Sequence, residues 1–120
     1  PSGIAVINKD SAVVTSVETS TIFMLGPEGK LIQKFRCQAH KPRHVAVGQY
    51  GAIAITSRDS HCVRVYDKYG KSVISKIGGE GSGPGQLKQP LGLCLDRYEN
   101  IVVADAGNHR VQVLSSGGEF

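Results

Sequence analysis

The chain has 120 residues, about the length of one small domain, and a formal net charge of +4 at pH 7. Apolar residues make up 40% of the sequence and charged residues 20%, which is the balance of a soluble globular protein. The longest apolar runs, such as the one at 101–104, are far shorter than the roughly 20 residues that cross a bilayer. The composition therefore excludes a helical membrane span, and no membrane partner is expected.

The cysteine content favours a reducing compartment. Cys37, Cys62 and Cys94 are an odd number without a short repeated spacing, whereas an extracellular disulfide framework usually has an even number. The N-terminus has no basic segment followed by an apolar one, so no secretory signal is visible. We therefore expect a cytoplasmic location.

The chain contains three copies of one unit. A shift of 41 residues places Pro1 on Pro42, and a shift of 48 residues places Pro42 on Pro90. The second shift needs no gap, and it matches Ile53 with Ile101, Ile55 with Val103, His61 with His109 and Val63 with Val111. The extra residues of the second copy fall almost entirely in the glycine-rich stretch at 77–90, where a loop would tolerate an insertion.

Each unit has four short runs that are typical of β-strands. In the second copy these runs lie at 44–47, 52–56, 62–66 and 72–77. β-Branched residues dominate the runs, and the separators contain Gly, Asp, Asn and Ser, which suit hairpin turns. The first two runs are apolar at consecutive positions, which indicates strands covered on both faces. Four antiparallel strands per unit of 40–48 residues predict a β-propeller blade.

The expected fold is therefore all-β, a partial propeller at 1–120 with about three blades of four antiparallel strands. Blade one spans 1–41, blade two spans 42–89, and an incomplete blade three spans 90–120 without its outer strand. A β-solenoid has shorter repeats, and a β-sandwich would not explain an ungapped internal match.

The third copy resembles an NHL repeat. The family pattern is Pro-x-Gly-apolar-x-apolar-Asp, then Asn-apolar-x-Val-Ala-Asp, then Asn-His-Arg-apolar-x-Val. The matching residues are Pro90, Gly92, Asp96, Asn100, Ala104, Asp105, Asn108, His109, Arg110 and Val113. The second copy keeps Pro42 and His61 but has Ser57 in place of the Asp and Cys62 in place of the Arg, and the first copy departs further.

The resemblance implies a six-bladed ring, of which these residues would form half. Each open end would then leave an apolar blade face bare. We therefore expect self-association, for example two copies closing a ring, or pairing with the remaining propeller blades.

The resemblance also implies a function. NHL propellers often form the C-terminal half of tripartite-motif (TRIM) ubiquitin ligases, where they select the substrate, and several bind RNA across one electropositive face. This similarity implies the substrate-recognition region of a TRIM-type E3 ubiquitin ligase, with the catalytic domain outside these residues. No catalytic residue and no cofactor is expected in this segment.

Three patterns in the sequence are possible sites of chemistry. The glycine-rich stretch lacks the spacing of a dinucleotide fingerprint or a P-loop and no helix follows it, so it predicts a blade connector. Asp105, Asn108, His109 and Arg110 lie at a hairpin that recurs in each blade of the family, so we expect them to bond turn backbone and neighbouring carbonyls.

Zinc is the third pattern, because Cys37, His40 and His44 are closely spaced and NHL-type propellers include a metal-dependent amidating lyase. Structural zinc sites usually show two paired ligand motifs, so no metal site is expected and a lyase is the least favoured function.

The charge distribution carries the functional prediction. The net charge is +2 over 1–41, +4 over 42–89 and −2 over 90–120. In an antiparallel meander, the turns between second and third strands emerge at the same end as the blade connectors. The candidate binding residues at that end are Arg36, His40, Lys41, Arg43, Arg58, His61 and Lys88.

A basic face suits an acidic protein segment or phosphate groups. We expect a protein substrate or adaptor as the partner, with single-stranded RNA on the same face as the alternative. Tyr50, Tyr69 and Tyr98 fall at the opposite end, which disfavours base stacking at the basic face.

Overall fold

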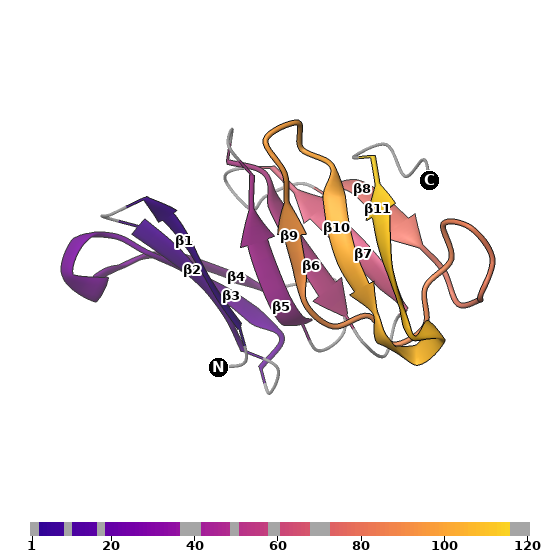
Figure 1. Cartoon of the computed structure of the whole chain (residues 1–120). Helices are drawn as coiled ribbons and strands as arrows, with labels where there is room; N and C mark the ends of the chain where they lie inside the picture. The colour runs from indigo at the N-terminus through magenta and orange to yellow at the C-terminus, as the bar shows by residue number, and fades with distance from the viewer. Residues whose placement is uncertain are drawn as a thin grey trace.

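The computed structural model describes residues 3–8, 11–16, 19–36, 42–48, 51–57, 61–67 and 73–115. These residues form three antiparallel sheets of four, four and three strands (Figure 1). The architecture is all-β, as predicted. No helix within the described ranges is long and apolar enough to cross a membrane.

The first sheet, blade one, has the strand order β1-β2-β3-β4. Its strands are β1 (Gly3–Asn8), β2 (Ser11–Ser16), β3 (Thr21–Leu25) and β4 (Leu31–Arg36). A short 3-10 turn, η1 (Pro27–Gly29), joins β3 to β4. This turn is tight because both Glu28 and Gly29 have a positive φ, 59° and 75°.

The second sheet, blade two, has the order β5-β6-β7-β8, and the third, blade three, has the order β11-β10-β9. The strands of blade two are β5 (Pro42–Val47), β6 (Ile53–Ser57), β7 (Cys62–Tyr66) and β8 (Val73–Gly78). Blade three comprises β9 (Leu93–Leu95), β10 (Ile101–Asp105), the 3-10 turn η3 (Ala106–Asn108) and β11 (Arg110–Leu114). The four strands expected in the second copy agree with these bounds to within two residues.

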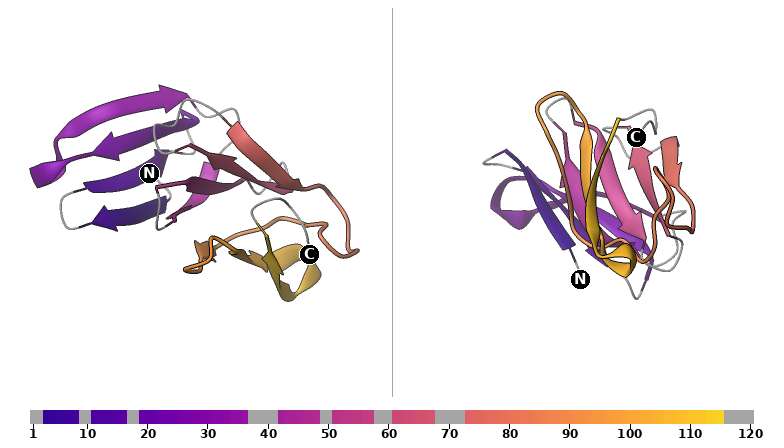
Figure 2. Two further views of the ribbon diagram at one scale, coloured as in Figure 1. Left: turned by 90° about the horizontal axis from the view of Figure 1, so that it is seen from above. Right: turned by 45° about the vertical axis from the view of Figure 1, so that its right-hand side comes forward.

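The three sheets stack face to face, with blade two in the middle (Figure 2). Between blades one and two lies an apolar cluster of Val13, Ile22, Val45, Ile53, Ile55 and Tyr66. Between blades two and three lies a second cluster of Ala54, Val63, Val65, Ile77, Leu87, Ile101, Val103 and Leu114. Successive side chains of a strand point to opposite faces, so β6 contributes to both clusters.

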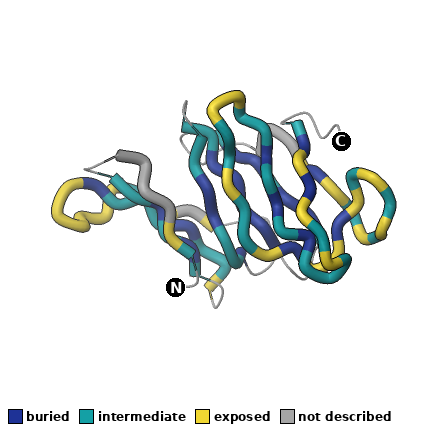
Figure 3. The backbone as a smooth tube through the Cα atoms, viewed as in Figure 1, coloured by how far each residue is buried: buried dark blue, intermediate teal, exposed yellow. Residues whose placement is uncertain are grey.

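The middle position of β6 explains its composition. All five of its residues are buried (Figure 3). A strand covered on both faces reads as a continuous apolar run rather than an alternating one. The prediction that this strand is covered on both faces is confirmed.

The repeat is also visible in the backbone. Ser20, His61 and His109 occupy the same position of the turn between second and third strands, and their φ values are 51°, 51° and 54°. Residues other than glycine rarely adopt this left-handed conformation. Its recurrence at matched positions shows that the three sheets are copies of one structural unit.

Candidate functional site

The glycine-rich connector runs from β8 to β9 and is held by protein groups along its length. The amide of Gly83 donates to Oε1 of Gln86 at 2.9 Å, and the amide of Gly85 donates to Oε1 of Gln112 at 3.1 Å. The amide of Gln86 in turn donates to the carbonyl of Gly83 at 3.1 Å. A phosphate site needs several amides turned toward a ligand, and these are used internally. The prediction of a blade connector is confirmed.

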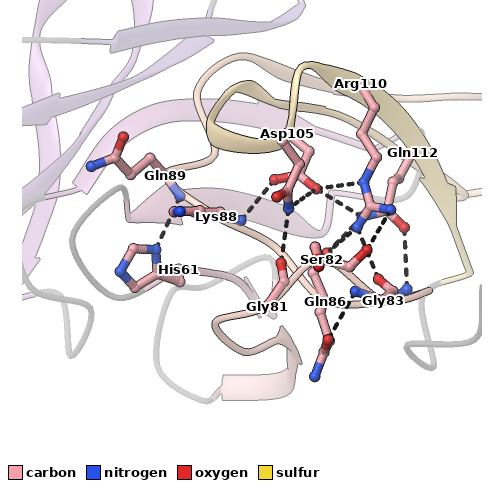
Figure 4. Close-up of polar contacts among 12 residues, drawn as sticks. His61, Gly81, Ser82, Gly83, Gln86, Lys88, Gln89, Asp105, Arg110 and Gln112 are labelled. Carbon is pink, nitrogen blue, oxygen red and sulfur yellow. Dashed lines mark hydrogen bonds and ion pairs between the residues drawn. The ribbon is translucent and has the colours of Figure 1, made fainter.

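Asp105 ends β10 and fastens the connector to blade three (Figure 4). Its side chain is fully buried, and Oδ1 accepts a hydrogen bond from the amide of Lys88 at 2.7 Å. Oδ2 accepts from Nδ2 of Asn108 at 2.9 Å, from Nε of Arg110 at 2.8 Å and from Nε2 of Gln112 at 3.1 Å. Burial by itself would raise the pKa of Asp105, but these hydrogen bonds outweigh it and hold the pKa below its usual value.

Arg110 extends the attachment to the connector carbonyls. Its NH1 group donates to the carbonyl of Ser82 at 3.0 Å, and NH2 donates to the carbonyls of Gly83 and Gln86, both at 2.9 Å. Asn108 reaches the same loop through Nδ2, which lies 2.8 Å from the carbonyl of Gly81. The prediction that Arg110 bonds neighbouring carbonyls is confirmed.

We call the set Asp105, Asn108, Arg110 and Gln112 the connector clamp. Sequence reasoning found three of its members and missed Gln112, whose Nε2 also donates to the carbonyl of Gln86 at 2.7 Å. Strand alternation was the available signal, since residues 110 and 112 share one face of β11. The Asp105 carboxylate accepts hydrogen bonds from the Lys88 amide and from the other three clamp side chains. The role of the clamp is therefore to hold the connector in place.

Four of the seven predicted binding residues fall within the described ranges. They are Arg36, Arg43, His61 and Lys88, while His40, Lys41 and Arg58 lie outside the described residues.

Strand register puts the four at one end of the sheets. Arg36 pairs with Thr21 at the start of β3. Arg43 follows Pro42, which pairs with the last residue of β6, and His61 immediately precedes β7. Lys88 lies against the turn after β10, because its carbonyl accepts from the amide of Gly107 at 2.8 Å.

Among these four, Arg36 and Lys88 are exposed, whereas Arg43 and His61 are partly buried. Arg36 lines a shallow pocket of about 430 Å³ together with Thr19, Thr21, Phe23 and Lys34. This pocket lies on the face of blade one that points away from blade two, since Ile22 between Thr21 and Phe23 is in the inter-blade cluster. Lys88 lies instead on the connector between blades two and three.

The imidazole ring of His61 contacts the connector. Its Nδ1 accepts a hydrogen bond from the amide of Gln89 at 3.0 Å (Figure 4). Its Nε2 lies 3.7 Å from Oε2 of Glu80. The imidazole therefore joins the turn before β7 to both ends of the connector. His61 is thus a positioning residue in this structure.

Of the three residues in the zinc pattern, the structure describes only His44. His44 is partly buried, and burial, followed by the charge of Arg43, lowers its pKa. Within the described part of the chain, no three His, Cys, Asp or Glu side chains lie close enough to hold a metal ion. Cys37 and His40 fall outside that part.

Comparison with known proteins places the clamp in a family motif. Residues 87–114 match the NHL repeat. Protein lin-41 of Caenorhabditis elegans is 41% identical over 66 residues, which cover 54% of this chain and 6% of lin-41. E3 ubiquitin-protein ligase TRIM71 of Rattus norvegicus is 31% identical over 116 residues, covering 83% of this chain and 14% of the ligase. The chain thus spans a small part of these relatives.

Solved structures show the same fold at low identity. A streptogramin B lyase superposes with a TM-score of 0.80 and 18% identity, over 98% of this chain and 38% of the lyase. Virginiamycin B lyase from Staphylococcus aureus superposes with a TM-score of 0.77 and 14% identity, over 99% of this chain and 39% of the lyase. At these identities the likeness extends to the fold alone, which is that of a partial propeller.

Proposed function

Because the chain is an NHL-repeat β-propeller segment similar to lin-41 and TRIM71, we propose that it is a non-enzymatic binding module. The module corresponds to the substrate-recognition region of a TRIM-type E3 ubiquitin ligase and engages an acidic segment of a protein substrate or adaptor. Any ligase chemistry resides in another part of the protein.

The main support for this proposal is the anchored backbone of Lys88. The amide of Lys88 donates to buried Asp105 and its carbonyl accepts from Gly107, so the backbone is fixed on both sides. The Lys88 side chain is nevertheless exposed. A cation displayed from an anchored backbone loses little freedom when it pairs with a carboxylate, so less binding energy is spent on ordering.

Arg36 provides a second exposed cation on a rigid element. It ends β4, which pairs with β3 along its whole length, and Lys34 precedes it on the same face. Lys41 and Arg58 are further cations of the predicted binding set, and Lys41 lies close to Arg36 in the sequence. An acidic partner would gain from several such contacts at once, each charge-assisted and each weakened by salt.

Titration of a fluorescent glutamate-rich peptide into the chain at low and at physiological salt would test the proposal. The double variant Arg36→Glu with Lys88→Glu should weaken binding at least tenfold. Lys30→Glu is the matched control, because Lys30 is exposed at the opposite end of blade one and should leave affinity unchanged. Equal affinity for the double variant and the wild type would refute a basic binding face.

The same titration with a single-stranded RNA pool distinguishes the alternative function. Submicromolar RNA binding with a steep salt dependence, together with no peptide binding, would replace the protein partner by RNA. Tyr98 argues against base stacking, because it is exposed in the turn between β9 and β10, at the other end of the sheet from Lys88. A metal-dependent lyase function has only the fold likeness in its favour.

A further inference from the structure

The connector enters blade three through a strained turn at Gln89. The φ of this residue is 48°, in the left-handed region that residues other than glycine rarely adopt. Gln89 also precedes Pro90, and a residue before proline is normally extended. Such a conformation persists only where the surrounding structure holds it. The contacts around Gln89 therefore decide whether the turn keeps its shape.

The backbone on either side of this turn is fixed by bonds that do not change between pH 5 and pH 8. The amide of Lys88 donates to Oδ1 of Asp105 at 2.7 Å. Burial would raise the pKa of that carboxyl, but its hydrogen bonds outweigh burial and lower the pKa, so it stays ionised over this range. Beyond the turn, the amide of Leu91 donates to the carbonyl of Ala104 at 3.0 Å, and the carbonyl of Leu91 accepts from Oγ1 of Thr56 at 2.8 Å.

The amide of Gln89 itself depends on His61. It donates to Nδ1 of the imidazole ring at 3.0 Å (Figure 4). An Nδ1 atom that accepts a hydrogen bond carries no proton, so this ring is neutral and its proton is on Nε2. That nitrogen faces Glu80, whose Oε2 lies 3.7 Å away. The ring thus lies between an amide that requires its neutral form and a carboxylate that favours its charged form.

The segments next to the ring carry several other charged side chains. They are Glu80 and Lys88 of the connector, Asp105 of blade three, and Arg58 and Asp59 of the turn before β7, the last two outside the described residues. The side chain of Glu80 is 66% exposed, so water screens its attraction for the ring. Protonation of Nδ1 would therefore exchange a backbone hydrogen bond for a screened ion pair.

We propose that His61 is a pH-sensitive latch for the end of the connector: the neutral ring holds Gln89, and protonation of Nδ1 releases it. A doubly protonated ring has no acceptor and would set one N–H group against another. Histidine is the side chain that ordinarily changes charge between pH 5 and 8. Because the connector clamp stays ionised over that range, the release is confined to the last residues of the connector.

The latch also bears on the binding face, and this consequence rests on the proposed function. Lys88 is the exposed cation that precedes Gln89. Release of Gln89 frees the backbone after Lys88, so an acidic partner must order more of the chain on binding. The imidazolium adds a positive charge at the same end, which acts in the opposite direction. The Gln89 amide, rather than binding, is therefore the direct readout of the latch.

Hydrogen exchange at the Gln89 amide, followed by NMR at pH 7.5 and pH 5.5 and corrected for intrinsic exchange, tests the latch. In the wild type, protection of this amide should fall about five- to tenfold on acidification, the effect of one lost hydrogen bond. The His61 ring should titrate over the same range. The amide of Gly85 should keep its protection, because its acceptor, Oε1 of Gln112, does not titrate. Unchanged protection of Gln89 would overturn the proposal.

Two substitutions of His61 separate the acceptor from the charge. His61→Asn carries Oδ1 on the same Cγ position that bears Nδ1, does not titrate, and tolerates the φ of 51°. Gln89 should then be protected at both pH values. His61→Ala lacks the acceptor, so Gln89 should exchange fast at both. A fall in protection that persists in His61→Asn would assign the pH dependence to another group and refute the latch.

His109→Asn is the matched control, since His109 is exposed and occupies the same position of the turn in blade three, with a φ of 54°. This variant should show the wild-type pH dependence at Gln89. Loss of that dependence in His109→Asn would contradict the assignment to His61.

Titration of the fluorescent glutamate-rich peptide into the same proteins distinguishes the latch from the proposed function. Peptide binding combined with a Gln89 amide that ignores pH would refute the latch and leave the binding module. A pH-dependent Gln89 amide without peptide binding would support the latch and refute the acidic partner.

Discussion

Replacing Asp105 with Asn removes the negative charge of the connector clamp with little change in shape. The carboxylate is buried, and Oδ2 accepts from Asn108, Arg110 and Gln112. An amide group placed there retains one acceptor, which can still serve the amide of Lys88. Its NH2 group would instead face three donors, so the substitution turns a filled acceptor site into a cluster of donors.

The magnitude follows from the bonds that are lost. A hydrogen bond to a charged group contributes about 1.5–3 kcal/mol, so three of them set an upper limit of roughly 5–9 kcal/mol. Arg110 keeps its contacts to three connector carbonyls, and Gln112 keeps its bond to Gln86, so part of this loss is recovered. We expect a decrease of about 3–5 kcal/mol in the free energy of unfolding, the range seen when one partner of a buried pair is removed.

Urea unfolding followed by circular dichroism measures this decrease, and hydrogen exchange at the connector amides locates it. Exchange at Gly83 and Gly85 should accelerate more in the variant than exchange at the amides of β6. Asp96→Asn is the control: Asp96 accepts from the amides of Tyr98 and Asn100 in an exposed turn, where water can replace lost bonds. Equal stability of the Asp105 variant and the wild type would refute the clamp as a stabilising element.

The clamp also sets a pH dependence. The pKa of Asp105 is lowered in the folded chain, so its carboxylate contributes stability above the unfolded-state pKa. This contribution is lost as the pH falls from that value through the lowered folded-state pKa. Acid titration of wild-type stability should therefore show a steeper decline than that of Asp105→Asn, in which the lowered pKa of Asp96 remains, and parallel curves would contradict this assignment.

The remaining predictions concern close packing and the contact between blades. Gly107→Ala should destabilise the fold by about 1–3 kcal/mol, because a Cβ atom there would lie 2.6 Å from the carbonyl oxygen of Lys88, whereas Gly92→Ala meets nothing within 4 Å and should be tolerated. Thermal unfolding of the two alanine variants checks this difference, and equal midpoints would disprove it. Thr56→Val should cost about 1 kcal/mol in urea unfolding, because the carbonyl of Leu91 loses its hydroxyl donor. Unchanged stability would show that this bond contributes nothing.

The sequence predicted the strands because their signals are local. In β6 every residue is apolar or small, and the structure buries all five. The internal repeat then added long-range information, since one recognisable blade fixed the register of the others. Position 109 illustrates this: His109 shares its left-handed conformation with His61 and Ser20, and the repeat aligns all three.

The candidate site was less predictable because its contacts join distant parts of the chain. His61 was predicted as a binding residue from its charge and position, yet its ring bonds the amide of Gln89, 28 residues away. No local pattern reports that contact, because it depends on the path of the connector. Strand alternation places Gln112 on the same face of β11 as Arg110, but it does not identify its partner Gln86, which lies 26 residues earlier.

The clamp residues of blade three do not recur at the equivalent positions of blade two. Blade three has Asp105 and Arg110, which hold the preceding connector, where blade two has Ser57 and Cys62. Blade two also bonds forward to blade three through Thr56, and the connector between these two blades, the longer of the two in the chain, is the one that the clamp holds. A long glycine-rich loop costs more entropy to order than a short one. The part of the chain that matches the NHL repeat thus includes the blade that follows this long connector. The clamp of that blade holds the connector and so keeps the backbone of Lys88 in a defined position.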